Sequence, residues 1–452
     1  MGLDHRAALV FVAATVSAVA LAAATTPTVK FTDTRLRNGL RVIIAEDHTA
    51  PVFSLAVAYN VGSRNERIGR TGFAHLFEHM MFKGSENVGA GEHLYTILSY
   101  GGSVNGTTNK ERTLYFETMP ANQLDAALFL EADRMRSLAV TKENLDNQRN
   151  AVQEERRLRI DNRPYGRADE AMEDIAFDNF AYKHSVIGSM DDLNAASVDD
   201  VTAFFKTYYA PNNAILAIAG DVNAAATLER VRSGFETIPE QPQPPPVDVG
   251  QPAQDKERRL EIEDPLARVP RVDIGYRIPS SLSPDDDALD VLAEILGSGR
   301  SSRFNEHIVR EKQFAVSARA FVPSSRGPRL LSIEATPTPG TPLDRLEQAI
   351  YSEIDGIKAG PVAEPEIEKA RNVARRRFTG GLGSSLSVAR TLAEFTLLYG
   401  DPGTINTRWE RLSKFSAADV QRVARQYLTP ENRTVIVTLP KAPSGSANGG
   451  AR

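Results

Sequence analysis

The chain has 452 residues, of which 41% are hydrophobic and 25% are charged, and this ordinary globular composition is enough for two domains with buried cores. Its formal net charge of −5 argues against partners that need a basic protein face, such as nucleic acid or an anionic membrane surface. The chain contains no cysteine, so it forms no disulfide and tolerates an oxidising compartment without using it.

The first 24 residues have the order of an export signal. Arg6 supplies a positive charge, residues 7–21 form an apolar core, and the alanines that follow offer a cleavage site of the Ala-x-Ala type. An uncleaved anchor is the alternative, but the apolar stretch is short and alanine-rich for a membrane span. We therefore expect cleavage near Ala23 or Thr25, a periplasmic or secreted mature protein, and no stable membrane anchor.

Residues 25–238 are expected to form a first domain of mixed strands and helices. Asn38–Gly39 between two β-prone segments predicts a hairpin over residues 34–45. Apolar periodicity and turn residues predict further strands at 52–59, 103–107, 113–118 and 214–219, and helices at 72–81, 92–100, 121–137, 142–160 and 197–208. Because strands and helices do not alternate as regular βαβ units, the predicted class is α+β.

The helix expected at 72–81 carries the motif His-Leu-Phe-Glu-His. At about 100° per residue, His75, Glu78 and His79 converge on one side of the helix, while the apolar residues face the other side. Two imidazoles one turn apart with a carboxylate beside them form the local half of a catalytic zinc site, the H-x-x-E-H signature. We expect His75 and His79 to bind the metal and Glu78 to act as the general base toward the metal-bound water. The alternative is a pair of surface histidines beside a helical glutamate.

A third ligand must come from elsewhere in the chain, and residues 147–158 offer one. In a helix, Glu155 lies about 60° from Val152 and from Leu158 on the apolar side, whereas Glu154 faces outward. A buried carboxylate needs a partner such as a metal, so Glu155 is the candidate. The alternative is an ordinary charged helix in which Glu155 pairs with an arginine.

Residues 239–254 are rich in proline and poor in large apolar residues, which predicts an extended linker. Behind this segment the pattern of the first half returns with a spacing of 219 positions. Asp200, Val201, Tyr208, Pro211 and Asn213 recur as Asp419, Val420, Tyr427, Pro430 and Asn432. We therefore expect two copies of one fold, with a second domain at 255–442 and a flexible tail at 443–452.

The second copy is expected to lack the metal site, because its corresponding helix at 290–297 contains no histidine. Its role would then be to shape a substrate surface. Residues 380–385 are glycine-rich, but they lack the lysine and the preceding strand of a phosphate-binding loop, so a flexible turn is predicted. His93 and His184 have no partners at ligand spacing, and we interpret both as ordinary loop or helix-surface residues.

The His-Leu-Phe-Glu-His motif, followed by the second glutamate of Asn-Ala-Val-Gln-Glu-Glu-Arg-Arg, resembles the pitrilysin/insulinase family of zinc peptidases, especially its short bacterial and mitochondrial-processing-peptidase-like members. The segments around Gly62–Ser63, 81–85 and 101–108 match the family as well. The resemblance implies that His75, His79 and Glu155 bind one zinc ion per chain and that Glu78 is the base. Gln148 departs from the pattern, because family members often have an acidic residue seven positions before the third ligand.

The resemblance also implies two homologous α+β domains, each a mostly antiparallel sheet with packed helices, that pair with another such chain as a clam shell around a chamber. Asn105 matches a position that contacts the main chain of the substrate. Arg310 matches an arginine that grips the substrate together with a tyrosine six positions later, but Val316 stands in place of that tyrosine and cannot donate its hydrogen bond. This favours a heterodimer with a homologous zinc-free chain, while a homodimer that does not need the pair, or that uses a nearby tyrosine instead, is the alternative.

Together these patterns predict an exported zinc metalloendopeptidase that cleaves peptides or unfolded segments. Two other functions stay open at this point. One is a non-catalytic structural or binding subunit of the same family, and the other is a metal-requiring hydrolase of non-peptide substrates.

Overall fold

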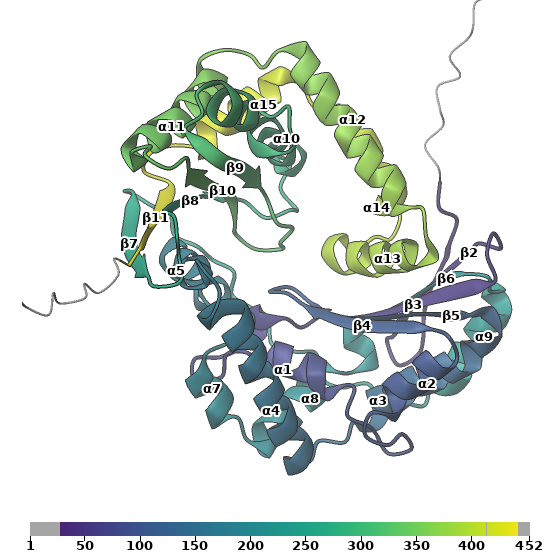
Figure 1. Cartoon of the computed structure of the whole chain (residues 1–452). Coiled ribbons are helices and arrows are strands. Elements are labelled where there is room, and N and C mark those ends of the chain that lie inside the picture. The colour runs from purple at the N-terminus through teal and green to yellow at the C-terminus, as the bar shows by residue number, and fades with distance from the viewer. Residues whose placement is uncertain (1–27, 413, 442–452) are drawn as a thin grey trace, which may run out of the picture.

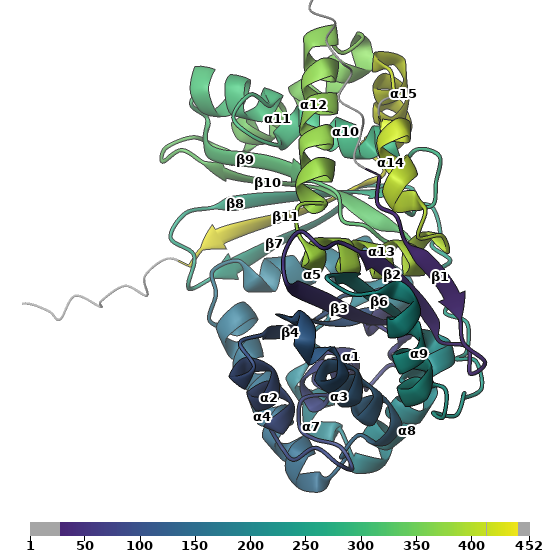
Figure 2. The ribbon, with the colours of Figure 1, turned by 90° about the vertical axis from the view of Figure 1, so that its right-hand side faces the viewer.

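In the computed structural model, which describes residues 28–412 and 414–441, the chain folds into two α+β halves, each built around one sheet (Figure 1, Figure 2). The expected fold class is confirmed. The predicted signal peptide and the predicted tail at 443–452 lie outside the described residues. Among the helices of this part of the chain, none has the length and apolar character that a membrane span requires.

The first half contains a six-stranded sheet in the order β1-β2-β6-β3-β5-β4. Its strands are β1 (Thr32–Arg35), β2 (Arg41–Glu46), β3 (Val52–Tyr59), β4 (Ser103–Thr108), β5 (Thr113–Pro120) and β6 (Ala214–Gly220). Its helices are α1 (Phe73–Met80), α2 (Glu92–Ser99), α3 (Leu124–Ser137), α4 (Lys142–Arg156), α5 (Gly166–Ala176), α6 (Phe180–Lys183), α7 (Met190–Ala195), α8 (Val198–Tyr208) and α9 (Ala224–Phe235). The pairing of β2 with β6 is parallel and the other pairings are antiparallel.

The second half repeats this arrangement in a five-stranded sheet of order β7-β11-β8-β10-β9. Its strands are β7 (Arg258–Asp264), β8 (Arg271–Ile278), β9 (Ala315–Phe321), β10 (Arg329–Pro337) and β11 (Arg433–Pro440). Its helices are α10 (Asp286–Gly297), α11 (Leu343–Ala359), α12 (Glu364–Gly381), α13 (Ser385–Tyr399), α14 (Thr404–Leu412) and α15 (Ala417–Tyr427). Here too one pairing, β7 with β11, is parallel.

The two halves exchange one helix each. α13 of the second half lies across the outer face of the first sheet, where Leu392 packs in one cluster with Ala217 of β6 (Figure 1). α5 of the first half lies against β8 and β11, where Met172 packs in one cluster with Ile436. These two helices begin 219 positions apart, as do β3 and β8, α8 and α15, and β6 and β11. The exchange therefore follows the internal repeat.

Helices on both faces of the first sheet explain its long apolar strands. Successive residues of β3 enter different cores: Leu55 and Val57 join the cluster that includes α1 and α3, whereas Ala56 and Ala58 lie in the cluster beneath α13. A strand covered on both sides needs apolar residues at every position instead of alternate ones. This sheet supports α1, which carries the motif, and it ends at the edge strand β4.

Two connecting segments differ in how well they match expectation. Residues 239–257 contain no helix or strand, and Asn179 donates side-chain hydrogen bonds to the carbonyls of Asp248 and Gly250, so the linker lies along the first half.

The prediction of a flexible turn at 380–385 is only partly right. The first two glycines belong to the last turn of α12, where glycine is tolerated near a helix end, and the turn itself spans 382–384.

Candidate metal centre

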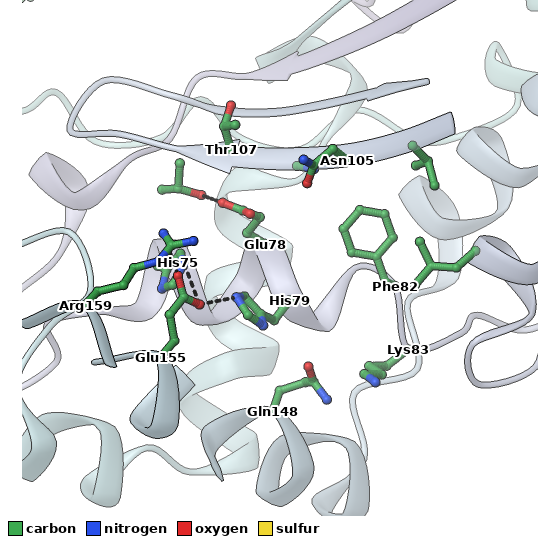
Figure 3. A pocket seen from close by; sticks show the side chains of 14 residues that line it. His75, Glu78, His79, Phe82, Lys83, Asn105, Thr107, Gln148, Glu155 and Arg159 are labelled. Carbon is green, nitrogen blue, oxygen red and sulfur yellow. Dashed lines mark hydrogen bonds and ion pairs between the residues drawn. The ribbon is translucent and has the colours of Figure 1, made fainter. Parts of the chain in front are cut away.

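α1 presents its polar residues and its apolar residues on opposite sides. Phe73, Leu76, Phe77 and Met80 are buried in the core of the first half, together with the α8 residues that pack on them. His75, Glu78 and His79 all line one pocket on the other side of the helix (Figure 3). The amphipathic pattern of the motif thus sets which face is available for chemistry.

Glu155, at the end of α4, meets the two histidines. Its Oε2 lies 3.2 Å from Nε2 of His79 and 3.6 Å from Nε2 of His75 (Figure 3). The neighbouring Glu154 points away, with 58% of its side chain exposed and an ion pair to Arg157. The helical phase expected from the sequence is therefore the observed one, and α4 turns Glu155 toward α1.

The three side chains fit a metal ion by position, and His75 and Glu155 also fit it by protonation state. One possible ligand atom from each of His75, His79 and Glu155 lies within 4.8 Å of the others. Burial, and then the neighbouring His79, lowers the pKa of His75 to about 4, so the imidazole is neutral near pH 7. The hydrogen bond from His79 is the main cause that lowers the pKa of Glu155 and keeps it a carboxylate. A neutral imidazole and a carboxylate are the forms that bind zinc, although metal binding by this set stays a prediction.

Glu78 is held beside this set by β4. The Thr108 hydroxyl donates a hydrogen bond of 2.6 Å to its Oε2. Gly106 allows the close approach of the strand, because a Cβ atom there would lie 2.9 Å from Cγ of Glu78. Burial raises the pKa of Glu78, while Thr108 and His79 oppose that shift. A carboxylate whose pKa is raised toward neutrality suits a general base.

The pocket is a cavity of about 570 Å³ between α1, β4 and α4. Asn105 lies on β4 at its edge, and Gln148 lies two turns before Glu155 on the same face of α4 (Figure 3). Arg310, by contrast, is an exposed residue of the π-helical segment Phe304–Glu311 in the second half and is not part of the pocket lining. The structure therefore brings five of the six predicted site residues together and leaves Arg310 apart.

Comparison with known proteins places this chain in a family. The family described as "Insulinase (Peptidase family M16)" matches residues 41–189, and the one described as "Peptidase M16 inactive domain" matches residues 195–374. The zinc protease PqqE of Helicobacter pylori is 30% identical over 409 residues, which cover 90% of this chain and 92% of that protein. The chain belongs to the M16 peptidase family.

Other M16 proteins resemble the chain over most of its length. A probable beta subunit of the mitochondrial-processing peptidase of Arabidopsis thaliana is 25% identical over 411 residues, covering 87% of this chain and 76% of that one. The crystal structure of a protease from Helicobacter pylori superposes with a TM-score of 0.87 at 29% identity, covering 91% of this chain and 100% of that chain. The resemblance noted in the sequence is thus confirmed, and the match to the inactive domain runs from the end of the first half into the half without the histidine motif.

Sequence reasoning missed two side chains that touch the M16 motif residues. Arg159 forms an ion pair of 2.7 Å with Oε1 of Glu155, the oxygen that faces away from the histidines (Figure 3). Its i+4 spacing from Glu155 was a signal that could have found it. Thr108, the partner of Glu78, had no such signal because it comes from a different element.

The start of α1 is capped by a distant residue. Gly72, which precedes the helix, offers no side-chain cap. Glu66 accepts hydrogen bonds from the backbone N–H groups of Gly72 at 2.9 Å and Ala74 at 2.8 Å, and its side chain is fully buried. A carboxylate at a helix N-terminus satisfies donors that the helix cannot and interacts favourably with its dipole. Glu66 thus fixes the helix that carries both histidines.

His184 in turn holds Glu66, which corrects the reading of this histidine as an ordinary loop residue. Its Nε2 lies 2.9 Å from Glu66 and 3.0 Å from the carbonyl oxygen of Ser63, and its Nδ1 lies 2.8 Å from the carbonyl oxygen of Phe180. A carbonyl oxygen only accepts, so Nδ1 donates to Phe180, while Nε2 lies between the Ser63 carbonyl oxygen and Glu66. The histidine is largely buried because it stacks on Phe180 and closes the loop under α1.

The reading of His93 as a helix-surface residue is wrong. Its residue exposure is 2%, and its ring packs edge-on against Phe82 with 5.8 Å between ring centroids. α2 turns this side chain inward toward Glu117 of β5 and Glu131 of α3. Those partners come from other elements, so no local spacing in the sequence announced them.

Proposed function

We propose that this M16 protein is an exported zinc metalloendopeptidase that hydrolyses peptides or unfolded polypeptide segments. The observation that carries the proposal is the convergence of His75, His79 and Glu155 in one pocket with Glu78 beside them. These three side chains would hold one zinc ion per chain. A zinc ion there would lower the pKa of a bound water and polarise the scissile carbonyl group.

The chain's own residues supply the proton transfer. Thr108 occupies Oε2 of Glu78, which leaves Oε1 to take a proton from the attacking water. The pocket walls on α1 and β4 keep this carboxylate partly out of bulk water, and burial raises its pKa. The carboxylate can therefore accept a proton during attack and return it to the leaving amine.

β4 offers a place for the substrate backbone. It is the last strand of the first sheet and pairs with β5 alone among the described strands. An extended peptide can add to such an edge through main-chain hydrogen bonds. Asn105 on β4 lines the pocket and is the residue we propose to contact the substrate main chain.

We propose that the chain pairs with a second two-domain chain to enclose the substrate. Arg310 and Val316 both lie in the second half, and Val316 on β9 is 57% exposed. A homologous zinc-free partner would bring the arginine and tyrosine that this chain lacks as a pair. Activity should rise when such a partner is co-expressed, or in Val316→Tyr. Full activity of the chain alone, with no gain from either, would contradict the heterodimer.

Export rests on the order of Arg6, the apolar core and the small residues in the first 24 positions. Mass spectrometry of the mature N-terminus checks it: we expect a start near Ala23 or Thr25. A mature protein that retains Met1 or Gly2 would contradict the cleavage.

A digest of a peptide mixture by the purified protein, with and without a chelator, tests the enzymatic proposal. We expect cleavage that the chelator abolishes and that added zinc restores. If the protein as purified contains no zinc and cleaves no peptide, that result would instead support a non-catalytic subunit. Cleavage that survives complete metal removal would contradict the proposed chemistry.

A further inference from the structure

A second group of metal-binding side chains lies in the core of the first half, outside the pocket. It consists of His93 on α2, Glu117 on β5 and Glu131 on α3. The side chains are 2%, 0% and 1% exposed, respectively. Nε2 of His93 lies 3.9 Å from Oε2 of Glu117 and 3.9 Å from Oε1 of Glu131. Three different elements, α2, β5 and α3, thus direct three ligands of two types at one point.

Two of these groups, His93 and Glu117, lack partners within the described part of the protein. Nε2 of His93 and both carboxylate oxygens of Glu117 are buried and form no hydrogen bond with any described residue. Buried polar atoms are almost always paired, and a fully buried carboxylate without a donor is the costliest exception. The three unpaired atoms of His93 and Glu117 lie beside the unpaired Nη1 of Arg134, and together they indicate a missing occupant.

The charges of the cluster point to a cation. Arg134 binds Glu131 through Nε and Nη2, and its guanidinium lies over the ring of Tyr115. Glu117 and Glu131 share this one arginine, which acts on both, so two ionised carboxylates would leave one negative charge without a counterpart. A proton on Glu117 would remove that charge, but its hydroxyl and carbonyl groups would still lack partners.

We propose that His93, Glu117 and Glu131 bind a second divalent transition-metal ion, of the zinc or manganese class. One imidazole nitrogen and two carboxylate oxygens form a donor set that these metals accept. Tetrahedral zinc places its ligand atoms roughly 3.4 Å apart, so the side chains would move inward by a few tenths of an ångström on binding.

Such an ion would have a structural role. The site is closed to solvent, whereas a catalytic metal needs an open coordination position. It would join α2, β5 and α3, and it lies behind Phe82, whose ring packs on His93 and lines the catalytic pocket. Because the ligands are buried, the ion would be taken up as the chain folds and would stabilise the folded state.

Metal analysis of the full-length mature protein tests the proposal. We expect two divalent ions per chain in the parent and one in the double variant His75→Ala/His79→Ala, which leaves the second site intact. Glu117→Gln should also hold one. The matched control is Glu111→Gln, because Glu111 is a buried carboxylate that Ser325, Tyr182 and Arg326 already satisfy, and it should hold two.

A second measurement covers variants that fold poorly. In His75→Ala/His79→Ala, which alters none of the proposed second-site ligands, a strong chelator should lower the melting temperature, and zinc or manganese should restore it. The proposal is wrong if this variant holds no metal and the chelator does not change its melting temperature. The cluster would then be a network of protonated or hydrated side chains. That outcome leaves the catalytic proposal standing, since the parent would still bind one ion at the pocket.

Discussion

The two halves of the molecule share a scaffold, but only the first carries the histidine motif. Apart from the extra edge strand β1 of the first half, their sheets have the same strand order and the same single parallel pairing, and several of their elements begin 219 positions apart. This spacing fails at the motif: α1 begins at Phe73 and its counterpart α10 at Asp286. The comparison teaches that the repeat preserves the scaffold and that the chemistry lies in the segment where the repeat is broken.

The acidic residues of the two helices have different partners. In the open pocket between α1 and α4, Glu78 faces a hydroxyl group, and Glu155 faces two imidazoles with one oxygen and Arg159 with the other. On α10 the carboxylates form ion pairs with arginines instead: Asp286 with Arg329, Asp290 with Arg408 and Glu294 with Arg377. α10 carries no histidine and its carboxylates are held by arginines, so it offers no counterpart of the metal-binding set on α1 and α4.

Changing the acid on each helix gives the largest expected difference. Glu78→Gln should keep its metal and lose hydrolysis by roughly 100-fold or more, because an amide cannot accept the proton. Glu294→Gln on α10 is the matched control and should retain normal turnover. Peptide-cleavage rates with metal analysis check both. Near-normal turnover in Glu78→Gln would show that another group is the base.

The third ligand can be tested with two adjacent residues. Glu155→Gln should weaken metal binding by at least about 100-fold, because it replaces the carboxylate that faces both histidines with a neutral amide. Glu154→Gln should change little, since its side chain is 58% exposed. Titration with a competing chelator measures both. The reverse order would mean that Glu154, not Glu155, reaches the metal.

The distant cap of α1 is expected to matter for stability and for metal binding. Glu66→Gln should lower the free energy of unfolding by about 3 kcal/mol, because it leaves His184 and a backbone donor without their charged partner. Urea unfolding measures this loss. Glu236→Gln is the control, because its partner Arg37 is on the surface, and no measurable change is expected. An unchanged unfolding curve in Glu66→Gln would show that the cap does not stabilise the helix that carries the site.

The exchanged helices should respond differently to pH. α13 meets β3 through the hydroxyl pair Ser385 and Ser54, whereas α5 meets β8 through Arg271, which binds both Asp169 and Asp273. Burial raises the pKa of Asp273 to about 7, and Arg271 opposes the shift. The folded protein then binds a proton that the unfolded chain releases near pH 4, so the contribution of Asp273 to stability falls as pH rises from about 4 to 7.

Urea midpoints across this pH range check the expectation. Asp273→Asn should lose that part of the pH dependence, while Ser54→Ala should keep the parent's pH profile. The same slope in Asp273→Asn and in the parent would show that Asp273 is already ionised in the folded protein at low pH.

The smallest effects concern two equivalent helix caps. Ser197 caps α8 and Ser416 caps α15, each in a capping box with an aspartate three residues later. Ser197→Ala and Ser416→Ala should each cost about 1 kcal/mol of stability. Thermal unfolding checks the pair. A clear difference between them would show that the scaffold is less symmetric than the sequence repeat suggests.

Periodicity and spacing predicted the scaffold well, because helices, strands and the repeat are local or regular signals. They also placed Glu155 inward and Glu154 outward, since both lie on one helix. The capping role of Glu66 and the burial of His93 were not predicted, because their partners lie on other elements and meet them only in the folded chain. The exchange of α5 and α13 was likewise not foreseen, although its 219-residue spacing was present in the sequence.

The exchanged helix α13 also constrains the order in which the molecule can be completed. Synthesis finishes the first sheet with β6, which ends at Gly220, but the helix that covers its outer face spans Ser385–Tyr399. Until then the apolar residues of that face, such as Ile43 and Leu114, have no cover from α13. A nascent chain therefore cannot close its first domain before most of the second has been made. The cover of the outer face of the first sheet is therefore completed only near the end of synthesis.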